Sequence, residues 1–417
     1  MKKTKLALAI TATIFTSSAI ATNGTNMTGV GTQANALGGT GVAAFYGAEN
    51  VIINPGIIGK SKGTAFTFGG TVFMPNVKND GSNPAAASSS SAANLNLIPS
   101  VSLVSRIDDN WTFGIGMFGT SGMGVDYRES SAPGVFNAQS QLQIMRFVPT
   151  LAYNESNFGI GLSPVIQYGN LDLNYKTDIT GDSVPDQIGS GASSDLGYGF
   201  DLGGYFDINK NTTVALSYQS AINMKYANQL SAASVPFAAP AAGGLNPSGL
   251  ALTALFGDEL EQPAEIKAGI SHEMGQYTLT ADVKQVKWAD AKGYKDFGWQ
   301  DQNVIALGVK YTDKNYWLGL GYNKADNPIK PLANTTTVAG AGITNMFNNV
   351  FFPATTEQHI SFGGGYKLNK TTTIEGSVVM APEVTSAVDI SGAAAAGTIN
   401  TTTHSQLSYN LSVSYNF

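Results

Sequence analysis

The chain has 417 residues, of which 43% are hydrophobic and only 12% charged, and it carries 48 glycines and no cysteine. Soluble domains average about 25% charged residues and about 7% glycine. No run beyond residue 21 approaches the roughly 18 consecutive apolar residues of a transmembrane helix, and aromatic and branched residues are too frequent for a disordered chain. The composition leaves an all-β protein, either soluble or a membrane barrel whose apolar residues are spread by alternation.

The first 21 residues predict a secretory signal peptide. Lys2, Lys3 and Lys5 precede a short apolar stretch, and residues 19–21 (Ala-Ile-Ala) match the small-x-small cleavage pattern. The apolar stretch is too short for a membrane anchor. Because the peptide holds three of the 23 basic residues and no acid, the mature chain is acidic, which argues against nucleic acid as a partner. An exported chain without cysteine also has no disulfide framework.

Residues 22–62 do not alternate as a strand would. They are rich in Gly, Ala, Thr and Asn, yet they hold seven apolar side chains whose need for burial argues against a disordered tail. These are Val42, Phe45, Val51, Ile52, Ile53, Ile57 and Ile58. A loose GxGxxA pattern at Gly29, Gly31 and Ala34 lacks the βαβ unit of a dinucleotide site. We expect a compact segment that plugs the lumen of a barrel from the periplasmic side.

From residue 63 onward the chain alternates with period two. In the last fourteen residues, six apolar side chains face one way and six polar ones face the other. The apolar ones are Leu407, Tyr409, Leu411, Val413, Tyr415 and Phe417. A soluble sandwich would carry Lys and Glu on its polar face, whereas small neutral residues suit a barrel lumen. The pattern recurs in 158–168, 196–206 and 316–323, where glycines on the inner face predict room for something large inside.

Turn signals allow the strands to be counted. Six short polar turns are expected at 108–110, 154–157, 209–211, 274–276, 313–315 and 369–371. Seven long connections are expected at 75–95, 119–140, 176–194, 225–263, 290–300, 327–356 and 385–403. These connections separate 14 strands of about ten residues, a length that crosses a bilayer at a tilt. The sequence predicts a closed 14-stranded antiparallel barrel over residues 63–417 in the bacterial outer membrane, with extracellular long loops and periplasmic termini.

The N-terminal segment resembles the hatch of the FadL family. These proteins are outer-membrane channels for long-chain fatty acids, with relatives that take up aromatic hydrocarbons. The resemblance is carried by residues 50–56, which end in Asn54, Pro55 and Gly56 where the family has Asn-Pro-Ala. Glycine in the last position departs from the family motif.

Further resemblances extend the likeness over nearly the whole mature chain. They lie at 119–127, at 286–290, and at the end of the chain, where Phe417 looks like the aromatic residue read by the barrel-assembly machinery. The resemblance implies a plugged barrel in which a kink in the third strand lets the ligand leave sideways into the membrane. Gly119, Gly122 and Gly124 are the candidate portal residues. Alternatively, these glycines accommodate a bulky neighbour in the lumen.

The resemblance also implies an outer apolar groove among the long loops. The candidates are Leu252, Leu255 and Phe256, on one face of a helix beginning at Pro247, with Phe351 and Phe352 from a later loop. Equally, these side chains could form a small loop core that shields the barrel mouth.

A fatty carboxylate would need a cation in the pocket. Alternation places five cations on the inward face, and they are Arg106, Arg146, Lys267, Lys284 and Lys310. The alternative is that inward cations pair with lumen acids such as Asp282 or tether the plug. An aromatic hydrocarbon would need none of them, so the sequence does not choose between the two substrates.

Other classes of function find little support. The three histidines show neither triad nor metal-ligand spacing, so we expect no enzyme, no metal and no cofactor. A general porin for small polar solutes is the main rival, although a porin should lack an N-terminal plug, and an added adhesin role stays open. The expected partners are a hydrophobic small molecule, outer-membrane lipid and the barrel-assembly machinery, with the channel itself a monomer.

Overall fold

The computed structural model describes residues 23–81, 88–132, 134–178, 182–237, 256–333 and 340–417, so the expected signal peptide lies outside the described residues. Seventeen strands form one hydrogen-bonded sheet. β2 (Ser89–Ser90) and β8 (Asp186–Ile188) are short additions at the loop ends of neighbouring strands. β5 (Gln139–Phe147) and β6 (Thr150–Glu155) are two halves of one strand. The wall therefore has 14 strands.

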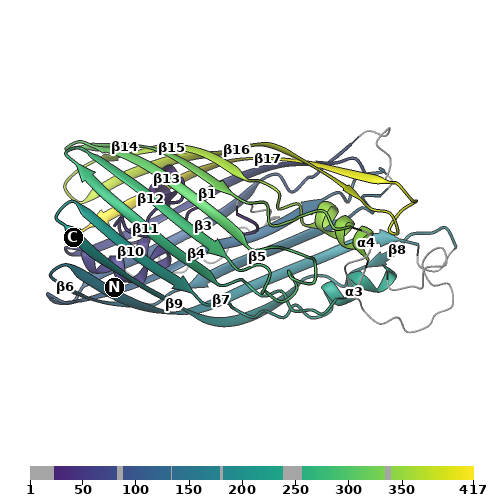
Figure 1. Ribbon diagram of the computed structural model, residues 1–417, viewed down its shortest axis with the longest axis horizontal. Coiled ribbons are helices and arrows are strands. Elements are labelled where there is room, and N and C mark those ends of the chain that lie inside the picture. Colours follow the sequence, from purple (N-terminus) through teal and green to yellow (C-terminus); the bar gives the residue numbers. More distant parts are fainter. Residues whose placement is uncertain (1–22, 82–87, 133, 179–181, 238–255, 334–339) are drawn as a thin grey trace, which may run out of the picture.

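The other wall strands follow one another around the barrel in chain order (Figure 1). They are β1 (Thr64–Asn79), β3 (Asn96–Arg106), β4 (Trp111–Asp126), β7 (Phe158–Thr177), β9 (Ser193–Asn209), β10 (Thr212–Gln219), β11 (Glu265–Met274), β12 (Tyr277–Val286), β13 (Gln302–Thr312), β14 (Tyr316–Ala325), β15 (Gln358–Lys367), β16 (Thr372–Asp389) and β17 (Ile399–Asn416). β17 pairs with β1 from Ala65↔Asn416 to Asn79↔Thr402, which closes the barrel. The predicted 14-stranded antiparallel barrel is confirmed.

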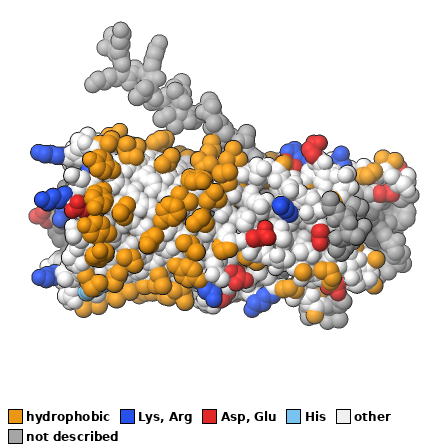
Figure 2. Space-filling view, turned by 90° about the horizontal axis from the view of Figure 1, so that it is seen from above, with side chains coloured by type: hydrophobic (Ala, Val, Ile, Leu, Met, Phe, Trp, Pro, Cys, Tyr) orange, Lys and Arg blue, Asp and Glu red, His pale blue; other side chains and the backbone are white. Residues whose placement is uncertain are grey.

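Alternation turns apolar side chains outward. On β14, Leu318 and Leu320 are 56% and 65% exposed, whereas Asn323 is buried on the inner side. Figure 2 shows the outward apolar side chains as a belt around one part of the barrel, with charged side chains at its end and over the other part. The belt suits a lipid environment, and the pairing of β17 with β1 leaves the sheet without a free edge strand.

Several strands are longer than the predicted ten residues, so that part of the prediction is wrong. β7 has 20 residues, and β16 and β17 have 18 each. Pairing continues beyond the apolar belt, where β16 carries Glu383 and Thr385 on its exposed side. The expected loops at 75–95, 119–140 and 385–403 are shorter for the same reason. The prediction ended each strand where its outward apolar residues stop. In the structure that point is the end of the apolar belt, and the strands continue beyond it.

Residues 23–62, here called the inner segment, pack against the inner faces of the wall strands (Figure 1, purple). Their helical turns are α1 (Thr32–Ala36), α2 (Asn50–Ile53) and η1 (Pro55–Lys60). Inward polar side chains hold them: Asn35 Nδ2 donates to Asn410 Oδ1 (3.0 Å), and the Gly38 N–H donates to Ser361 Oγ (3.0 Å). These bonds span more than 300 residues of sequence.

Wall glycines make room for the inner segment. A β-carbon on Gly308 would stand 2.8 Å from Leu37 Cβ, and one on Gly363 would stand 2.7 Å from Ala36 Cβ. Real β-carbon contacts are not so short. The prediction that inner-face glycines leave space for something large is confirmed at these positions.

The described loops add four short helical turns. They are α3 (Leu230–Ser234), η2 (Val235–Phe237), α4 (Ala341–Met346) and η3 (Phe347–Phe351). Throughout the described residues, every helix is too short or too polar to cross a membrane.

Candidate functional site

A cavity of about 80 Å³ lies between the inner segment and the wall. The inner segment contributes residues 26–30 and several apolar side chains, and the wall contributes five charged ones. The charged residues are Arg146, Glu265, Lys267, Asp282 and Lys284. With three cations and two acids, the lining carries a net positive charge.

Two of the cavity cations touch no carboxylate. The buried Arg146 guanidinium donates to the amide oxygens of Gln167 (2.9 Å) and Gln219 (2.5 Å), which are neutral. Lys284 stands directly opposite Lys267 in the β11–β12 pair and makes no hydrogen bond or ion pair within the described residues. Like charges opposite each other destabilise a strand pair. An anion in the cavity would relieve this repulsion and gain charge-assisted hydrogen bonds.

The two acids of the cavity hold the inner segment. Glu265 forms an ion pair with Lys267 (2.9 Å) and also accepts a hydrogen bond from Asn26 Nδ2 (2.7 Å). Asp282 accepts from the N–H groups of Gly41 (2.8 Å) and Val42 (3.0 Å). The acids are therefore occupied, whereas two of the three cations are available.

Arg106 and Lys310 do not reach the cavity. Arg106 donates to the carbonyl oxygens of Gly59 (3.2 Å) and Ser61 (3.0 Å), which fixes the end of the inner segment. Lys310 Nζ donates to Gln33 Oε1 (3.0 Å) and lies over aromatic rings. The structure therefore brings three of the five expected cations together and gives the other two to the inner segment as tethers.

The wall is interrupted between β3 and β4. These strands pair only from Arg106↔Thr112 to Ser100↔Phe118. Contact resumes where the Ala92 N–H donates to the Asp126 carbonyl oxygen (2.8 Å). Between these points lies what we call the β3–β4 gap, bounded by residues 96–99 and 119–125. The expected portal residues Gly119, Gly122 and Gly124 lie on its β4 edge, and on the other side of β4 the register with β5 shifts between Gly119 and Ser121.

The start of the inner segment covers this edge. The Met27 N–H donates to the Thr120 carbonyl oxygen (3.1 Å), and the Gly122 N–H donates to the Thr25 carbonyl oxygen (3.0 Å). We call residues 23–27 the strap. A cavity of about 10 Å³ beside the gap shares Met27 and Val30 with the larger one, so these residues separate the two spaces. No sequence pattern predicted the strap, because its pairing with β4 is a contact across nearly a hundred residues.

The Asn-Pro-Gly motif contacts β9 and β10 from within. Asn54 Oδ1 accepts from the Gly56 N–H (2.9 Å), which begins η1. Its Nδ2 donates to the carbonyl oxygens of Val42 (2.8 Å), Gly204 (3.3 Å) and Leu216 (3.4 Å). One buried side chain therefore folds the motif and joins it to the wall.

Glu49 is a buried acid at the centre of the inner segment. It is 4% exposed, and its Oε2 accepts from the Thr32 N–H (3.2 Å). Burial, reinforced by the nearby Glu375 carboxylate, raises the pKa of Glu49 to about 8. The group is therefore mostly protonated at neutral pH.

The expected outer groove coincides with an aromatic cluster in the loops. Phe256 lies 4.4 Å from Phe297 and 5.7 Å from Phe347, centroid to centroid, and Phe351 and Phe352 belong to the same buried group. Leu252 and Leu255 lie outside the described residues. All the described members are buried, so the cluster is closed in this conformation.

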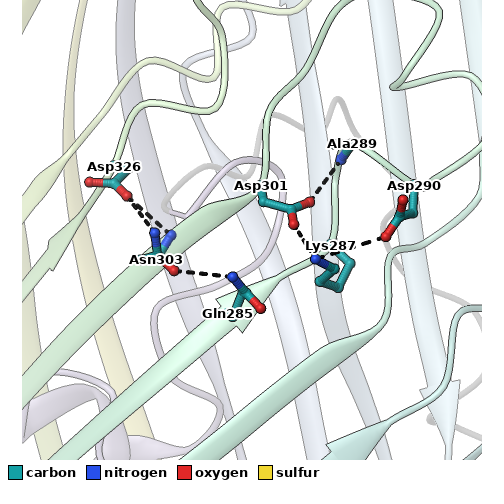
Figure 3. Close-up of polar contacts among 7 residues, drawn as sticks. All are labelled: Gln285, Lys287, Ala289, Asp290, Asp301, Asn303 and Asp326. Carbon is teal, nitrogen blue, oxygen red and sulfur yellow. Dashed lines mark hydrogen bonds and ion pairs between the residues drawn. The ribbon is translucent and has the colours of Figure 1, made fainter.

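The 286–290 stretch supports this cluster (Figure 3). Lys287 forms an ion pair with Asp301 and lies 3.9 Å from Asp290, while the Ala289 N–H donates to Asp301 (3.1 Å). Trp288 thereby packs fully buried, with ring neighbours 4.6 and 5.0 Å away. A neighbouring chain of contacts in Figure 3 links Gln285, Asn303 and Asp326.

The last residue, Phe417, follows the end of β17 and lies beside the start of β1. Its N–H donates to the Thr64 carbonyl oxygen (2.8 Å), and its side chain is exposed. The terminal aromatic ring is thus accessible at the end of the barrel that carries the short turns.

Known proteins share this architecture. The chain is 23% identical over 402 residues to the long-chain fatty acid transport protein of Escherichia coli (strain K12), covering 81% of this chain and 90% of the relative. Among solved structures, it is similar to the Pseudomonas putida toluene transporter TodX (TM-score 0.67, 18% identity, 94% and 99% of the two chains). It is also similar to a Pseudomonas aeruginosa FadL homologue (TM-score 0.69, 14% identity, 94% and 100%). The family described as outer membrane protein transport protein (OMPP1/FadL/TodX) matches residues 8–417, and the chain belongs to this family.

Proposed function

We propose that the protein is an outer-membrane channel for passive uptake of hydrophobic molecules, which leave sideways through the β3–β4 gap into the membrane. The gap carries the proposal, because the pairing of β3 with β4 stops at Ser100↔Phe118 although both strands continue past this point. Leu95 and Leu97, on the β3 side of the gap, are each 52% exposed and apolar. A lateral exit of this kind keeps an apolar ligand out of water.

The inner segment acts as the plug of this channel. In this division, residues 1–21 are a removed signal peptide, 22–62 the plug and 63–417 the barrel. Supporting contacts are the hydrogen bonds that the inner segment donates to Asp282, Asn410 and Ser361. A general porin for polar solutes, the rival function, would need an open aqueous lumen in place of these contacts.

In the membrane, the long loops face outward and both termini face the periplasm. Figure 1 places the chain end and the short turns at one end of the barrel, opposite α3 and α4. The exposed Phe417 ring suits recognition by the assembly machinery, and the pairing of β17 with β1 within one chain suits a monomer.

The relatives are named for two kinds of cargo, long-chain fatty acids and toluene. The cavity favours the fatty acid, because Arg146 and Lys284 line it and neither forms a direct ion pair with a carboxylate of the described residues. A neutral hydrocarbon in the cavity would displace water from these charges without forming hydrogen bonds or ion pairs with them.

Uptake into vesicles that contain the purified protein tests this function. We expect oleate to enter faster than into empty vesicles, with glucose excluded. A variant lacking residues 22–62 should admit glucose. Oleate entry no faster than in empty vesicles would refute the channel, and an unchanged glucose barrier in the shortened variant would refute the plug.

A further inference from the structure

An open groove of about 670 Å³ crosses the outer, lipid-facing side of the wall. Its apolar lining consists of outward side chains that are 45–67% exposed: Leu151, Ile160, Leu162, Leu202, Leu216 and Ile266. Gly204 stands directly opposite Leu216 in the β9–β10 pair and contributes no side chain, which hollows the surface at this point. The volume is within the range of small-molecule binding sites.

The inner segment does not account for this hollow. A β-carbon on Gly203, which faces inward, would overlap the Asn54 side chain, so the inner segment explains that glycine. A β-carbon on Gly204 would meet only the neighbouring strand, at 3.0 Å from the Gly159 carbonyl oxygen and 3.5 Å from Ile160. The missing side chain at Gly204 therefore shapes the outer surface and makes no room in the lumen.

The groove rises from one rim of the barrel into the apolar belt. It crosses β4, β6, β7, β9, β10 and β11, which are paired in that order, and Figure 1 shows β6, β7 and β9 along one side of the barrel. It begins at Trp111, the first residue of β4 beside a short turn, and ends at Ile266, near the loop end of β11. Five strand spacings of about 4.8 Å make the groove about 24 Å long. Its length and apolar lining match an extended lipid acyl chain.

The rim end of the groove is aromatic and polar. The rings of Trp111 and Tyr153 meet edge to face, with their centroids 5.2 Å apart, and both residues line the groove. The Tyr153 hydroxyl donates a hydrogen bond to Glu155 Oε2 (3.2 Å), so an exposed carboxylate lies at this end. Aromatic rings beside a carboxylate attract an ammonium group.

The same rim carries a net negative charge. The turns 108–110 and 154–157 are joined because Asn110 and Asn154 exchange two hydrogen bonds (2.8 and 3.0 Å). The exposed carboxylates of the two turns are Asp108, Asp109 and Glu155. Arg106 acts on Asp108 from the preceding strand and offsets one of these charges. The rim therefore suits a cationic group and repels a head group with net negative charge.

We propose that this groove, here called the lipid groove, binds a phospholipid of the phosphatidylethanolamine type. Its ammonium group lies beside Glu155 and the Trp111 ring, and one acyl chain follows the groove toward Ile266. The inference goes beyond the proposed function, because it uses the placement of the protein in the outer membrane and does not depend on passage of cargo. In the proposed orientation the rim faces the periplasm, so the bound lipid belongs to the inner leaflet.

Quenching of tryptophan fluorescence by brominated lipids tests the lipid groove. Trp111 is 39% exposed, whereas the other three tryptophans are at most 6% exposed, so bromine in the upper part of an acyl chain quenches mainly Trp111. The protein is placed in vesicles of phosphatidylethanolamine and phosphatidylglycerol in equal amounts, with bromine on one lipid or the other. We expect phosphatidylethanolamine to be preferred up to about fivefold, the factor of an exposed ion pair. Trp111→Phe gives the background from the buried tryptophans.

A charge substitution tests the head-group end. Glu155→Gln should abolish the preference for phosphatidylethanolamine. Asp313→Asn, in another short turn at the same end of the barrel, is the matched control and should keep the preference.

A second substitution tests the acyl-chain end. Leu216→Phe, which places a ring over Gly204, should lower the quenching of Trp111 by both lipids because it fills the groove. Leu411→Phe is the matched control, since Leu411 is 63% exposed and also stands opposite a glycine, Gly376, but lies outside the lipid groove. This variant should be quenched like the wild-type protein.

Equal quenching by the two brominated lipids, or stronger quenching by phosphatidylglycerol, would overturn the inference, because the groove would then hold membrane lipid without selecting its head group. A preference that persists undiminished in Glu155→Gln would overturn it as well. Oleate entry into the same vesicles separates this inference from the proposed function. Entry without a lipid preference refutes the lipid groove alone, and a lipid preference without entry refutes the channel alone. Folding of each variant is checked by the faster migration of the unheated barrel on a gel.

Discussion

Gly56 lies against Gly203 of β9 so closely that a β-carbon on Gly56 would stand 2.7 Å from the Gly203 carbonyl oxygen. The contact is backbone to backbone, so no flexible side chain could yield. This explains why glycine here replaces the alanine of the related motif: the first turn of η1 sits directly on the wall.

Gly56→Ala should therefore loosen the inner segment. Overpacking typically costs about 1–3 kcal/mol, and here it would push η1 away from β9. We expect faster proteolysis within residues 23–62 of the folded protein. Gly376→Ala is the matched control, because its nearest neighbour would be a leucine side chain at 3.5 Å. Equal proteolysis of the two variants would show that the close contact between Gly56 and Gly203 does not determine how firmly the inner segment is held.

Asn54→Ala should detach the same motif by a different route. The substitution leaves the Gly56 N–H and three carbonyl groups without their side-chain partner. We expect a loss of about 1–3 kcal/mol and a measurable leak of glucose into vesicles. Asn315→Ala, in an exposed turn, is the control and should stay tight. If the Asn54→Ala variant did not leak glucose, Pro55 and its neighbours would be sufficient to hold the inner segment without this side chain.

The sequence predicted the wall of the barrel better than the arrangement of the residues inside it. Alternation determines which side chains face inward, and it correctly turned Trp317 and Asn323 toward the interior. Alternation does not predict at which level along the barrel axis an inward side chain lies, or whether it contacts the inner segment there. For this reason Lys284 and Lys310 looked equivalent, although one lines the cavity and the other tethers Gln33.

The contact between the strap and β11 was beyond prediction for a related reason. Asn26 and Glu265 are 239 residues apart, and neither belongs to a motif. Their contact depends on the path of a segment without periodicity across a lumen whose width follows from the whole barrel. The Asn-Pro-Gly motif, in contrast, was recognisable because a local side-chain cap defines it.

The stability of the packed inner segment should depend on pH through the titration of Glu49. The ordinary pKa of its carboxyl group is 4.5, and in the folded protein it is about 8. Between these values the folded state binds the extra proton, so stability falls as pH rises from about 4.5 to about 8 and falls no further above it. Each pH unit in this window costs up to about 1.4 kcal/mol.

Hydrogen exchange of residues 23–62 at pH 5.5 and 7.5 measures this effect. Local opening should be more frequent at the higher pH, after correction for the intrinsic exchange rate. Glu49→Gln, which keeps the shape and removes the titration, should lose most of the difference. A pH dependence that persists undiminished in Glu49→Gln would place its origin in another group.

The loop cluster should depend on aromatic packing far more than on its ion pair. Lys287 and Asp301 keep 29% and 26% of their side chains exposed, and an ion pair so close to solvent contributes about 1 kcal/mol or less. Trp288 is fully buried, and truncation of a buried tryptophan costs about 3–5 kcal/mol. Trp288→Ala should therefore expose residues 286–300 to protease and, because Gly24 rests on the indole ring, loosen the strap as well. Lys287→Met should leave both nearly unchanged. If Lys287→Met proved as damaging as Trp288→Ala, the ion pair in Figure 3 would be the principal support of the loop, and the packing of Trp288 would be its consequence.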